Sequence, residues 1–511
     1  MPISFTEQQR KAMESRGGRL IVSAAAGSGK TAVLVQRVIG LLCDEAYPRG
    51  IDRLLVVTFT NAAASEMRAK IASALLERLA DDPQNANLKR QLALLPQARI
   101  QTVHSFCMDL IRTHAPLCDV SSDFMLSDET EYDLLKEAAM DELLERRCAE
   151  ASPAFERLCD AICEERGDGR LAEVVLDMYE RLRSHPDPDA WLTRAAEGDD
   201  TAEPGDTPWG AYLLRNAANM LQYALARVSE RCTWLADGAR TESERKWIPV
   251  MDEVRQRLAA LRTAADEGWD ALRTQLGAWS NPRAPRAAKD GDRAEHELCL
   301  AVKARANDIV KTIRADLICA PAERVMEEAA RAQPLVRELC ALVREFGVLY
   351  GAEKKRRNLL DFSDLEHLAL ALLRTPVAQE VASSLDELLV DEYQDTNEIQ
   401  DTIFAAVTPP NGSVFLVGDV KQSIYKFRLA EPEIFVRKYL AWRDYDEADG
   451  GDRRLALNRN FRSRGEVLSL CNFLFSRLMT REFGDIDYTD DEALYCGASY
   501  PGACPAEFHV V

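Results

Sequence analysis

The chain has 511 residues, of which 47% are hydrophobic, and a formal net charge of −20 at pH 7. That length allows about three domains of usual size. No apolar run reaches the roughly 20 residues of a membrane-spanning helix, and the N-terminal residues lack the basic and apolar regions of a signal peptide. The thirteen cysteines include no Cys-x-x-Cys pair, so the composition favours a cytoplasmic protein with reduced thiols over a secreted, disulfide-stabilised one.

Residues 23–31 are the first informative segment. The apolar stretch 20–22 predicts a short buried strand before it, and the apolar spacing of residues 32–39 predicts a helix after it. The order strand, loop, helix is that of a phosphate-binding loop. The first glycine of the usual pattern is replaced by Ala24, so an ordinary glycine turn before a helix remains an alternative.

The loop contains the residue types that a triphosphate needs. Gly27 and Gly29 allow backbone conformations in which several N–H groups point into one concavity and bind phosphate oxygens. Lys30 can reach the β- and γ-phosphates, and the hydroxyl of Thr31 can bind Mg²⁺. The segment therefore predicts a site for ATP and Mg²⁺.

A second segment predicts the hydrolytic side of the same site. Asp391 and Glu392 follow an apolar stretch that reads as a buried parallel strand, and ligands of open α/β sheets bind at the carboxyl ends of the strands. Asp391 would hold Mg²⁺, directly or through water, and Glu392 would orient and deprotonate the attacking water. Gln422 could bond the γ-phosphate or that water. An Asp-Glu pair is also common on solvated surfaces, but Lys30 upstream favours the hydrolytic interpretation.

The elements suggest an interrupted α/β domain. Strand-like and helix-like segments alternate in residues 1–120 and return in residues 355–450, whereas residues 121–354 have long helical periodicity. Lys30 and Asp391 are 361 positions apart (391 minus 30), which exceeds a typical domain. We therefore expect an α/β ATP-binding domain of parallel strands with a large helical insertion. Further strands are expected at residues 54–59, 388–390, 414–417 and 455–457, and a helix at residues 62–79.

One capping motif marks the return to the α/β domain. Ser363 and Glu366 are three residues apart before an apolar helix, which predicts a capping box. Asp361 has no assigned role in this interpretation.

Two segments combine basic and aromatic residues despite the acidic total. These are residues 421–428 and 459–464, and the local field decides where a polyanion binds. Tyr425 and Phe427, next to Arg428, could stack on unpaired bases at about 1–3 kcal/mol per base. Alternatively, one ring belongs to the core and the other covers the loop.

Seven segments resemble, in order, the motifs of superfamily 1A DNA helicases of the UvrD/Rep type. They are residues 5–10, 23–31, 58–67, 101–106, 391–395, 418–428 and 457–463. Ala24 is the usual form at its position in that family. Within the family, residues 184–191, 361–367 and 417–425 are similar to the AddA subunits of AddAB helicase–nucleases.

The resemblance implies a fold and a function. It implies two RecA-like domains with ATP between them, the second beginning at residues 451–511, and a helical insertion that rides on the duplex or the strand. The implied activity is ATP-dependent 3′-to-5′ DNA translocation by a helicase. That helicase would form a heterodimer with an AddB-like partner subunit, bind single-stranded DNA and duplex ends, and process double-strand breaks for recombinational repair.

The resemblance also implies single contacts. Gln9 would bond the adenine edge with Arg37 beside it, Phe461 would stack on the adenine, and Arg462 would contact the γ-phosphate. Phe461 could instead be strand core and Arg462 a surface charge. Thr60, Asn61 and His104 fall in motifs that touch single-stranded DNA in relatives, although chemistry alone would make His104 a buried hydrogen-bonder.

The candidate residues are Lys30, Asp391, Glu392 and Gln422 for catalysis; Gln9, Ala24, Ala25, Ala26, Gly27, Ser28, Gly29, Lys30, Thr31, Arg37, Phe461 and Arg462 for the nucleotide; Thr60, Asn61, His104, Tyr425, Phe427 and Arg428 for DNA; and Thr31 and Asp391 for the metal.

The end of the chain carries a further expectation. The sequence ends in a strand-like stretch at 506–511, soon after the 457–463 motif, and has no counterpart of the arginine finger or the nuclease. An arginine finger contributes about 10³- to 10⁵-fold in rate. We therefore expect this chain alone to bind nucleotide weakly and to hydrolyse it poorly.

Two other functions compete with a DNA motor. A non-motor subunit could use the fold as a DNA-binding scaffold, but the intact Lys30, Asp391, Glu392 and Gln422 argue against that. An ATP-dependent switch unrelated to DNA would not need the segments 58–67 and 421–428.

Overall fold

The computed structural model describes residues 5–44, 49–163, 169–198, 201, 203–239, 241–286, 293–447, 450–480, 486–502 and 505. The strand-like stretch expected at 506–511 lies outside these residues. The chain divides into two compact units, Met1–Trp191 with Ala341–Val511 and Leu192–Cys340.

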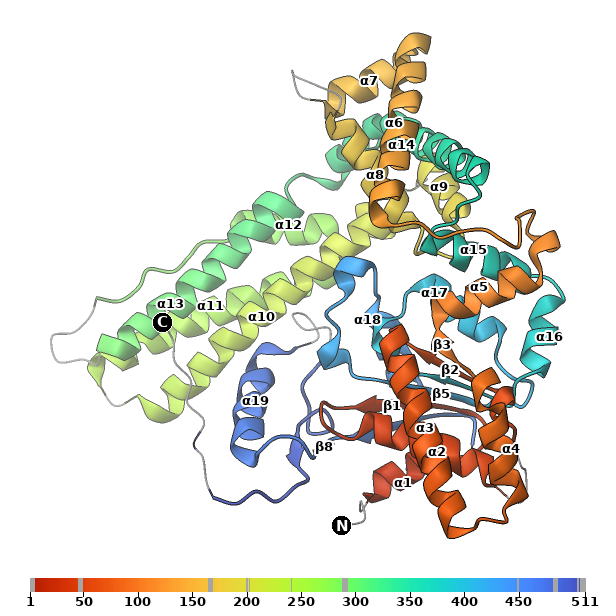
Figure 1. Cartoon of the computed structure of the whole chain (residues 1–511). Helices are drawn as coiled ribbons and strands as arrows, with labels where there is room; N and C mark the ends of the chain where they lie inside the picture. Colours follow the sequence, from red (N-terminus) through yellow and green to blue (C-terminus); the bar gives the residue numbers. More distant parts are fainter. Residues whose placement is uncertain are drawn as a thin grey trace. The chain divides into compact units, whose positions relative to one another are not determined.

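The first unit is built around a parallel sheet (Figure 1). In the described part of the chain the sheet has seven strands in the order β3-β2-β4-β5-β1-β7-β6. They are β1 (Arg19–Ala24), β2 (Leu54–Thr58), β3 (Arg99–Thr102), β4 (Glu387–Val390), β5 (Val414–Gly418), β6 (Arg443–Asp444) and β7 (Asp452–Leu457). The predicted α/β fold with a parallel sheet and a large helical insertion is confirmed. Because β5 alone separates β1 from β4, the carboxyl ends of these two strands lie close together on one edge.

Helices cover both faces of the sheet. Leu54 and Val56 of β2 pack into one core, and Leu55 and Val57 pack into the other, as the period of two in a strand requires. One face is covered by α2 (Lys30–Leu42), α3 (Asn61–Asp81) and α4 (Ala86–Leu94), and the other by α5 (Val103–Thr113), α15 (Phe362–Leu373), α16 (Val377–Ser383), α17 (Glu398–Ala406) and α18 (Pro432–Ala441). A short α1 (Glu7–Glu14) packs on α2.

The expected domain boundary at residue 450 is corrected by the pairing of β7. The expected boundary puts this strand in the second RecA-like domain, but β7 pairs in parallel with β1 from Arg19 opposite Asp452 to Ala24 opposite Leu457. Arg19 Nε donates to Asp452 Oδ1 at 2.6 Å. The described residues after β7 form β8 (Arg459–Asn460), α19 (Gly465–Leu478) and β9 (Tyr495–Cys496), and β8 pairs with β9 outside the large sheet.

The separate helical unit is also shorter than the expected insertion at 121–354. The helices α6 (Glu129–Glu150), α7 (Pro153–Ile162) and α8 (Gly169–Leu182) belong to the first unit. Tyr132 Oη donates to Leu360 O at 2.8 Å, and Arg183 Nη2 donates to Asp364 Oδ1 at 3.0 Å. These bonds connect the insertion's first helices to the segment that leads back into the sheet.

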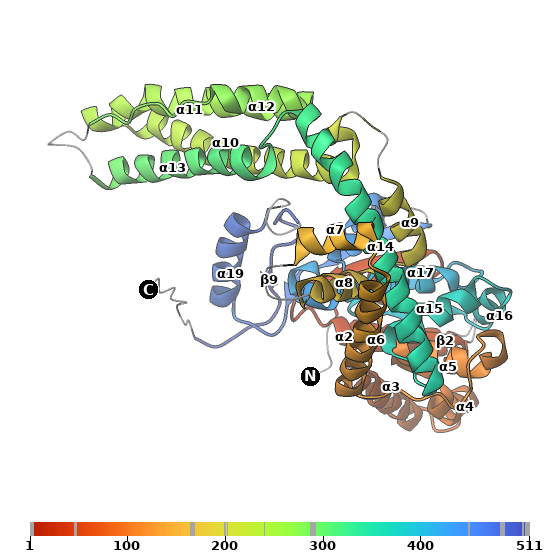
Figure 2. The ribbon, with the colours of Figure 1, turned by 90° about the horizontal axis from the view of Figure 1, so that it is seen from above.

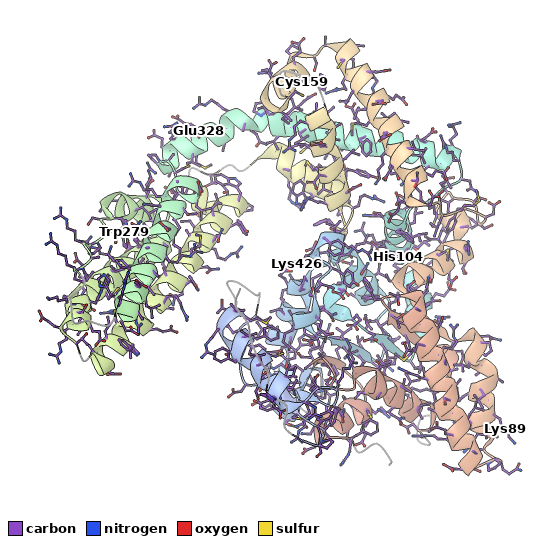
Figure 3. The ribbon with its side chains drawn as sticks, turned by 60° about the vertical axis from the view of Figure 1, so that its left-hand side comes forward. Lys89, His104, Cys159, Trp279, Glu328 and Lys426 are labelled. Atoms are coloured by element: carbon purple, nitrogen blue, oxygen red, sulfur yellow. The ribbon has the colours of Figure 1, made fainter. Side chains whose placement is uncertain are left out.

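The second unit is all-helical in its described residues. Figure 2 shows α10, α11 and α13 side by side. The core of this unit includes the buried Trp247. Its helices are α10 (Pro208–Gly238), α11 (Glu242–Glu267), α12 (Trp269–Ala278) and α13 (Arg293–Thr312), with the end of α9 (Pro188–Glu197) and the start of α14 (Ala322–Arg356). Trp279, labelled in Figure 3, donates its Nε1 to Asn307 Oδ1 at 3.3 Å. Within the described ranges, none of the helices has the length and apolar character needed to cross a bilayer.

The cap of α15 differs from the prediction. Asp361, not Ser363, is the N-cap: its side chain accepts from Asp364 N at 2.8 Å, and the side chain of Asp364 accepts from Asp361 N at 3.0 Å. Ser363 Oγ accepts from Arg183 Nε at 2.9 Å instead. The two aspartates also bind the buried ammonium of Lys354, each at 2.5 Å. The cap is therefore part of a buried charge cluster.

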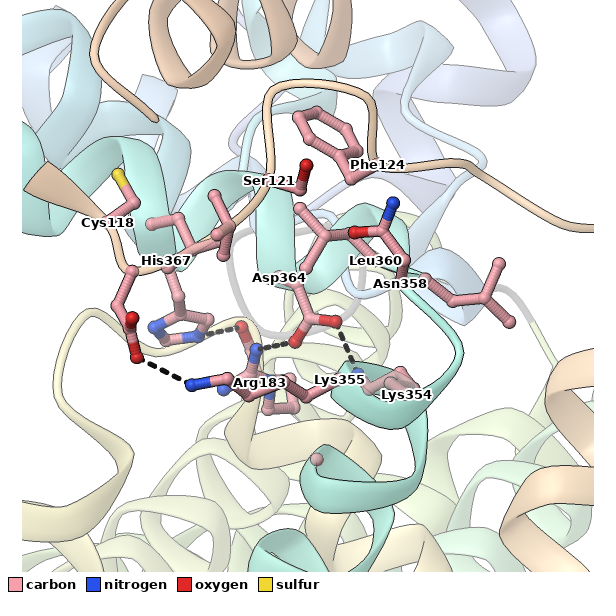
Figure 4. A pocket seen from close by; sticks show the side chains of 15 residues that line it. Cys118, Ser121, Phe124, Arg183, Lys354, Lys355, Asn358, Leu360, Asp364 and His367 are labelled. Carbon is pink, nitrogen blue, oxygen red and sulfur yellow. Dashed lines mark hydrogen bonds and ion pairs between the residues drawn. The ribbon is translucent and has the colours of Figure 1, made fainter. Parts of the chain in front are cut away.

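His367, one turn further along α15, lines a pocket beside this cluster (Figure 4). Its Nε2 lies 3.0 Å from Arg183 O. Burial lowers the pKa of His367 from 6.5 to about 4, and the Arg183 guanidinium acts in the same direction. The folded protein therefore holds this imidazole neutral.

We expect His367 to make the fold sensitive to acid. Because its folded pKa is depressed, its stabilising contribution is complete above pH 6.5 and is lost as the pH falls towards 4. His367→Gln, which cannot be protonated, should remove about 3 kcal/mol of the acid-induced loss in the free energy of unfolding. Urea unfolding at a series of pH values measures this, with the partly exposed His185→Gln as a control. Equal pH slopes for wild type and His367→Gln would contradict the expectation.

Candidate active site

The predicted phosphate loop connects β1 to α2. Gly27 and Gly29 have φ angles of +69° and +80°, in the left-handed region that favours glycine. Gly29 is the N-cap of α2 and no side chain caps the helix, so its first N–H groups are available to an anion. Among the described residues, the buried Oγ of Ser28 has no hydrogen-bond partner. The loop therefore fits a bound phosphate chain, with Lys30 as the first residue of the helix.

The carboxylates predicted at the end of β4 face this loop. Lys30 Nζ and Glu392 Oε2 are 2.5 Å apart, so residues separated by 362 positions form an ion pair. Asp391 N donates to Val57 O at 2.9 Å, which extends the sheet pairing to this residue. Burial raises the pKa of Asp391 to about 6, against the lowering influence of the Lys30 ammonium.

The donor set suits Mg²⁺ together with a phosphate ligand. In the described part of the chain, no group of three or more His, Cys, Asp or Glu side chains could hold a metal by itself. The Thr31 hydroxyl and the Asp391 carboxylate are hard oxygen donors, and Mg²⁺ commonly takes one or two protein ligands with phosphate and water supplying the rest.

Gln9 and Phe461, the two side chains predicted to hold the adenine, line one small pocket with Ser28 of the phosphate loop. Gln9 Nε2 donates to Ser28 O at 2.9 Å, and its Oε1 accepts from Thr6 N at 2.8 Å in a capping box of α1. Phe461 N donates to Gly27 O at 2.9 Å. The Gln9 side chain and the Phe461 backbone are therefore fixed against the loop.

Arg37 does not lie in this pocket, and this corrects the expectation. Its side chain is 2% exposed, its Nε donates to Glu387 Oε1 at 2.6 Å, and its Nη1 donates to Ala12 O at 2.7 Å. The guanidinium also lies 4.6 Å from the ring centroid of Phe415. These contacts hold the Arg37 guanidinium in the core beside the sheet.

Arg462 begins beside the phosphate loop. Asn460 Nδ2 donates to Ala26 O at 2.6 Å, and its Oδ1 accepts from Arg462 N at 2.8 Å. A Cβ on Gly27 would approach the Cβ of Arg462 to 2.9 Å. The Arg462 side chain therefore starts near the position of a nucleotide phosphate, although it also fits a surface charge.

Gln422 follows β5 and is exposed. Its Nε2 donates to Asp419 Oδ2 at 2.7 Å, and Lys421 Nζ lies 3.0 Å from the other oxygen of Asp419. The segment after β5 is thus held at its start by a buried aspartate.

A cavity of about 520 Å³ connects the carboxylates to most of the expected DNA contacts. Its lining includes Asp391, Glu392, Thr60, His104, Tyr425 and Arg428. We call this cavity the groove. Asn61, the exposed first residue of α3, and Phe427, which is 74% exposed, lie outside the lining.

Ring side chains gather along the groove. Tyr425 lies 4.7 Å from Phe59 and 5.9 Å from Phe427 between ring centroids, and His104 lies 4.8 Å from Phe362. The guanidinium of Arg428 lies 5.5 Å from the Tyr425 ring. The sequence analysis does not identify Phe59 or Phe362. Phe59 directly follows β2 and Phe362 begins α15, and an aromatic residue at such a position is the signal that could have indicated them.

His104, labelled in Figure 3, has a buried partner that the sequence did not reveal. Its Nε2 lies 3.2 Å from Glu366 Oε1, which also accepts from Gln400 Nε2 at 2.7 Å. Glu366 therefore connects α5, α15 and α17 instead of capping α15. His104 is partly exposed to the groove, so it is both a hydrogen-bonder and accessible.

Residues 5–441 match the model of the family described as the UvrD/REP helicase N-terminal domain. The chain is similar to proteins named as the A subunits of ATP-dependent helicase/nucleases in Geobacillus kaustophilus (40% identical), Bacillus licheniformis (38%) and Clostridium acetobutylicum (36%). The alignments cover 97%, 98% and 97% of this chain but 41%, 41% and 42% of those relatives. The chain thus spans about two fifths of the length of these relatives.

Proposed function

Because the chain belongs to the UvrD/REP helicase family, we propose that it forms the ATP-binding part of a DNA helicase that translocates from 3′ to 5′. The further proposal is that it belongs to an A-type subunit of a helicase–nuclease, which processes double-strand breaks for recombinational repair. The relatives' name supports this assignment, since each is called a subunit of a helicase/nuclease.

One observation carries the proposal. The groove is lined by Asp391 and Glu392 together with Thr60, His104 and Tyr425. A cavity that joins hydrolytic carboxylates to ring side chains suits a motor in which single-stranded nucleic acid and ATP hydrolysis affect each other.

The residues divide the work on the nucleotide. The N–H groups of Gly27, Gly29 and Lys30 and the Lys30 ammonium would bind the phosphates, and Gln9 and Phe461 would hold the adenine. Thr31 and Asp391 would hold Mg²⁺. When bound, ATP and Mg²⁺ supply the scissile phosphoanhydride and neutralise charge on its oxygens.

Glu392 would act as the base. Its ion pair with Lys30 must open for Lys30 to reach a phosphate, and the carboxylate is then free to take a proton from water. Gln422 and Arg462 would contact the γ-phosphate. Hydrolysis then depends on charge placed by these side chains, which is the usual source of rate in phosphoryl transfer.

The proposed partners follow from the same assignment. We propose single-stranded DNA and duplex ends as ligands, a heterodimer with an AddB-like partner subunit, and a cytoplasmic location.

The test measures ATP turnover with and without single-stranded DNA. The protein used is this chain fused at its C-terminus to the segment that follows the matched region in one of its relatives. We call this protein the extended chain. DNA is expected to stimulate turnover, and Lys30→Ala is expected to abolish it, because the variant loses the cation that binds the phosphates. Lys70→Ala, an exposed lysine on α3, serves as the control. Equal turnover in wild type and Lys30→Ala would remove the motor assignment.

A second prediction concerns base stacking. Phe427→Ala should weaken binding of single-stranded oligothymidylate to this chain about 5- to 150-fold, the equivalent of one stack of about 1–3 kcal/mol. Fluorescence anisotropy at constant salt measures the affinity, because salt alone changes it strongly. Phe473→Ala is the matched control, since Phe473 is an exposed ring on α19 that also packs against an arginine. Equal affinities of the two variants would contradict a stacking role for Phe427.

A further inference from the structure

Gln394 is a buried polar residue that has no role in the reaction proposed above. It lies two positions after Glu392, in a short turn at Tyr393–Asp395, and is 1% exposed. Its Nε2 donates to Glu392 Oε2 at 2.9 Å and to Asp395 Oδ2 at 3.0 Å, and its Oε1 accepts from Asp419 N at 2.9 Å. Both amide hydrogens and the carbonyl oxygen are therefore used.

The orientation of this amide follows from its neighbours. Two carboxylate oxygens surround one end and a backbone N–H faces the other. A flipped amide would put its oxygen against both carboxylates and its NH₂ group against a donor. The nitrogen therefore faces Glu392.

Gly418 shows how closely the side chain is fitted. A Cβ on Gly418 would approach Gln394 Oε1 to 2.4 Å and Gln394 N to 3.0 Å. Any larger residue at the end of β5 would displace the amide from Asp419. The glycine before Asp419 thus permits the contact between the β4 and β5 ends.

The hydrogen bonds continue into the segment after β5. Asp419, whose N–H is held by Gln394, accepts from Gln422 Nε2 at 2.7 Å. A continuous path therefore runs from Glu392 through Gln394 and Asp419 to Gln422. The same segment continues to Tyr425 at the groove.

Glu392 itself depends on few contacts. Its φ of +52° is a left-handed conformation that is unfavourable for a glutamate. In the described part of the chain, Lys30 Nζ and Gln394 Nε2 are the donors to its carboxylate. If Lys30 turns to a phosphate, Gln394 remains.

We propose that Gln394 is a positioning residue that holds the carboxylate of Glu392 in place for deprotonating water and links it to Asp419 and Gln422. This inference rests on the proposed function, because it assigns Gln394 a role in the same hydrolysis. Gln394 touches neither nucleotide nor water in this role and acts only through Glu392.

The test uses Gln394→Glu in the extended chain with single-stranded DNA present. This variant keeps the volume and the acceptor for Asp419 N but loses the NH₂ group that Glu392 accepts from. We expect kcat to fall about 10- to 100-fold while KM for ATP changes less than about threefold. In a Glu392→Gln background, the same substitution should change kcat less than about twofold, since the group on which it acts is already gone.

Gly418→Ala approaches the same contact from the other side. The added methyl group displaces the Gln394 amide without changing its chemistry, so we expect a similar loss of kcat. This variant keeps the inference testable if Gln394→Glu folds poorly. A wild-type kcat in both variants would overturn the inference, and so would a loss of full size in the Glu392→Gln background. If turnover of the extended chain still needs DNA and Lys30, either of these two results would overturn only the inference about Gln394 and not the proposed function. Absence of DNA-stimulated turnover in the unsubstituted extended chain would instead remove the proposed function.

Discussion

Glu392→Gln is expected to lower DNA-stimulated ATP turnover of the extended chain by about 10²- to 10⁴-fold, the usual contribution of a positioned base. The glutamine has the same shape but cannot accept the proton. It also removes the negative charge 2.5 Å from Lys30, so the lysine is freer to bind phosphate. The affinity for a fluorescent ATP analogue should therefore stay the same or rise.

Steady-state turnover and analogue binding, measured on the same preparations, separate the two effects. Glu66→Gln provides a control, because Glu66 is an exposed carboxylate on α3 paired with Lys70. Turnover within about threefold of the unsubstituted protein would show that Glu392 is not the base. A parallel loss of nucleotide binding would show that the substitution damages the site itself.

Glu387→Ala is expected to destabilise the fold by about 3–5 kcal/mol, the usual result of removing one partner of a buried ion pair. The carboxylate is 0% exposed and accepts from Arg37 Nε at 2.6 Å, Arg49 Nη1 at 2.8 Å and Ser413 Oγ at 3.0 Å. Its removal leaves the cation of Arg37 buried without its counter-ion. Because Glu387 begins β4, the strand that leads to Asp391 is affected directly.

The midpoint of urea unfolding measures the loss, provided the slope of the transition is unchanged. Asp177→Ala is the matched control: it breaks an Arg–Asp pair whose side chains are 69% and 63% exposed, and such pairs contribute about 0–1 kcal/mol. If both substitutions cost the same, the buried pair would have no special role in stability.

The sequence predicted the parts of the site that local pattern determines. The phosphate loop and the Asp391-Glu392 pair each sit at the end of an apolar strand, and parallel strands bring such ends to one edge of the sheet. The Lys30–Glu392 ion pair agrees with that expectation. The aromatic segment around Tyr425 was found because its rings alternate with basic residues, which is visible without a structure.

Other features depend on neighbours far away in sequence. An arginine in an amphipathic helix usually lies at the surface, and only the partner Glu387, 350 positions later, explains why Arg37 is buried. Two overlapping patterns, Asp361 with Asp364 and Ser363 with Glu366, compete for the cap of α15. Arg183 and Lys354, both from outside α15, favour the first.

The position of β7 shows a similar gap. A short apolar strand reveals its burial but not its partner, so the resemblance placed it in the second domain. The pairing with β1 is set by the register from Arg19 to Ala24, which no local pattern in residues 452–457 contains.

This pairing gives the molecule a mechanical property. β7 is bonded along β1, and directly beyond it Asn460 Nδ2 holds Ala26 O while Phe461 N holds Gly27 O. A tensile force applied to the chain after Phe461 would therefore be transmitted to the phosphate loop through these hydrogen bonds. The loop predicted to bind phosphate is thus also bonded to the segment that leads into the chain beyond residue 461.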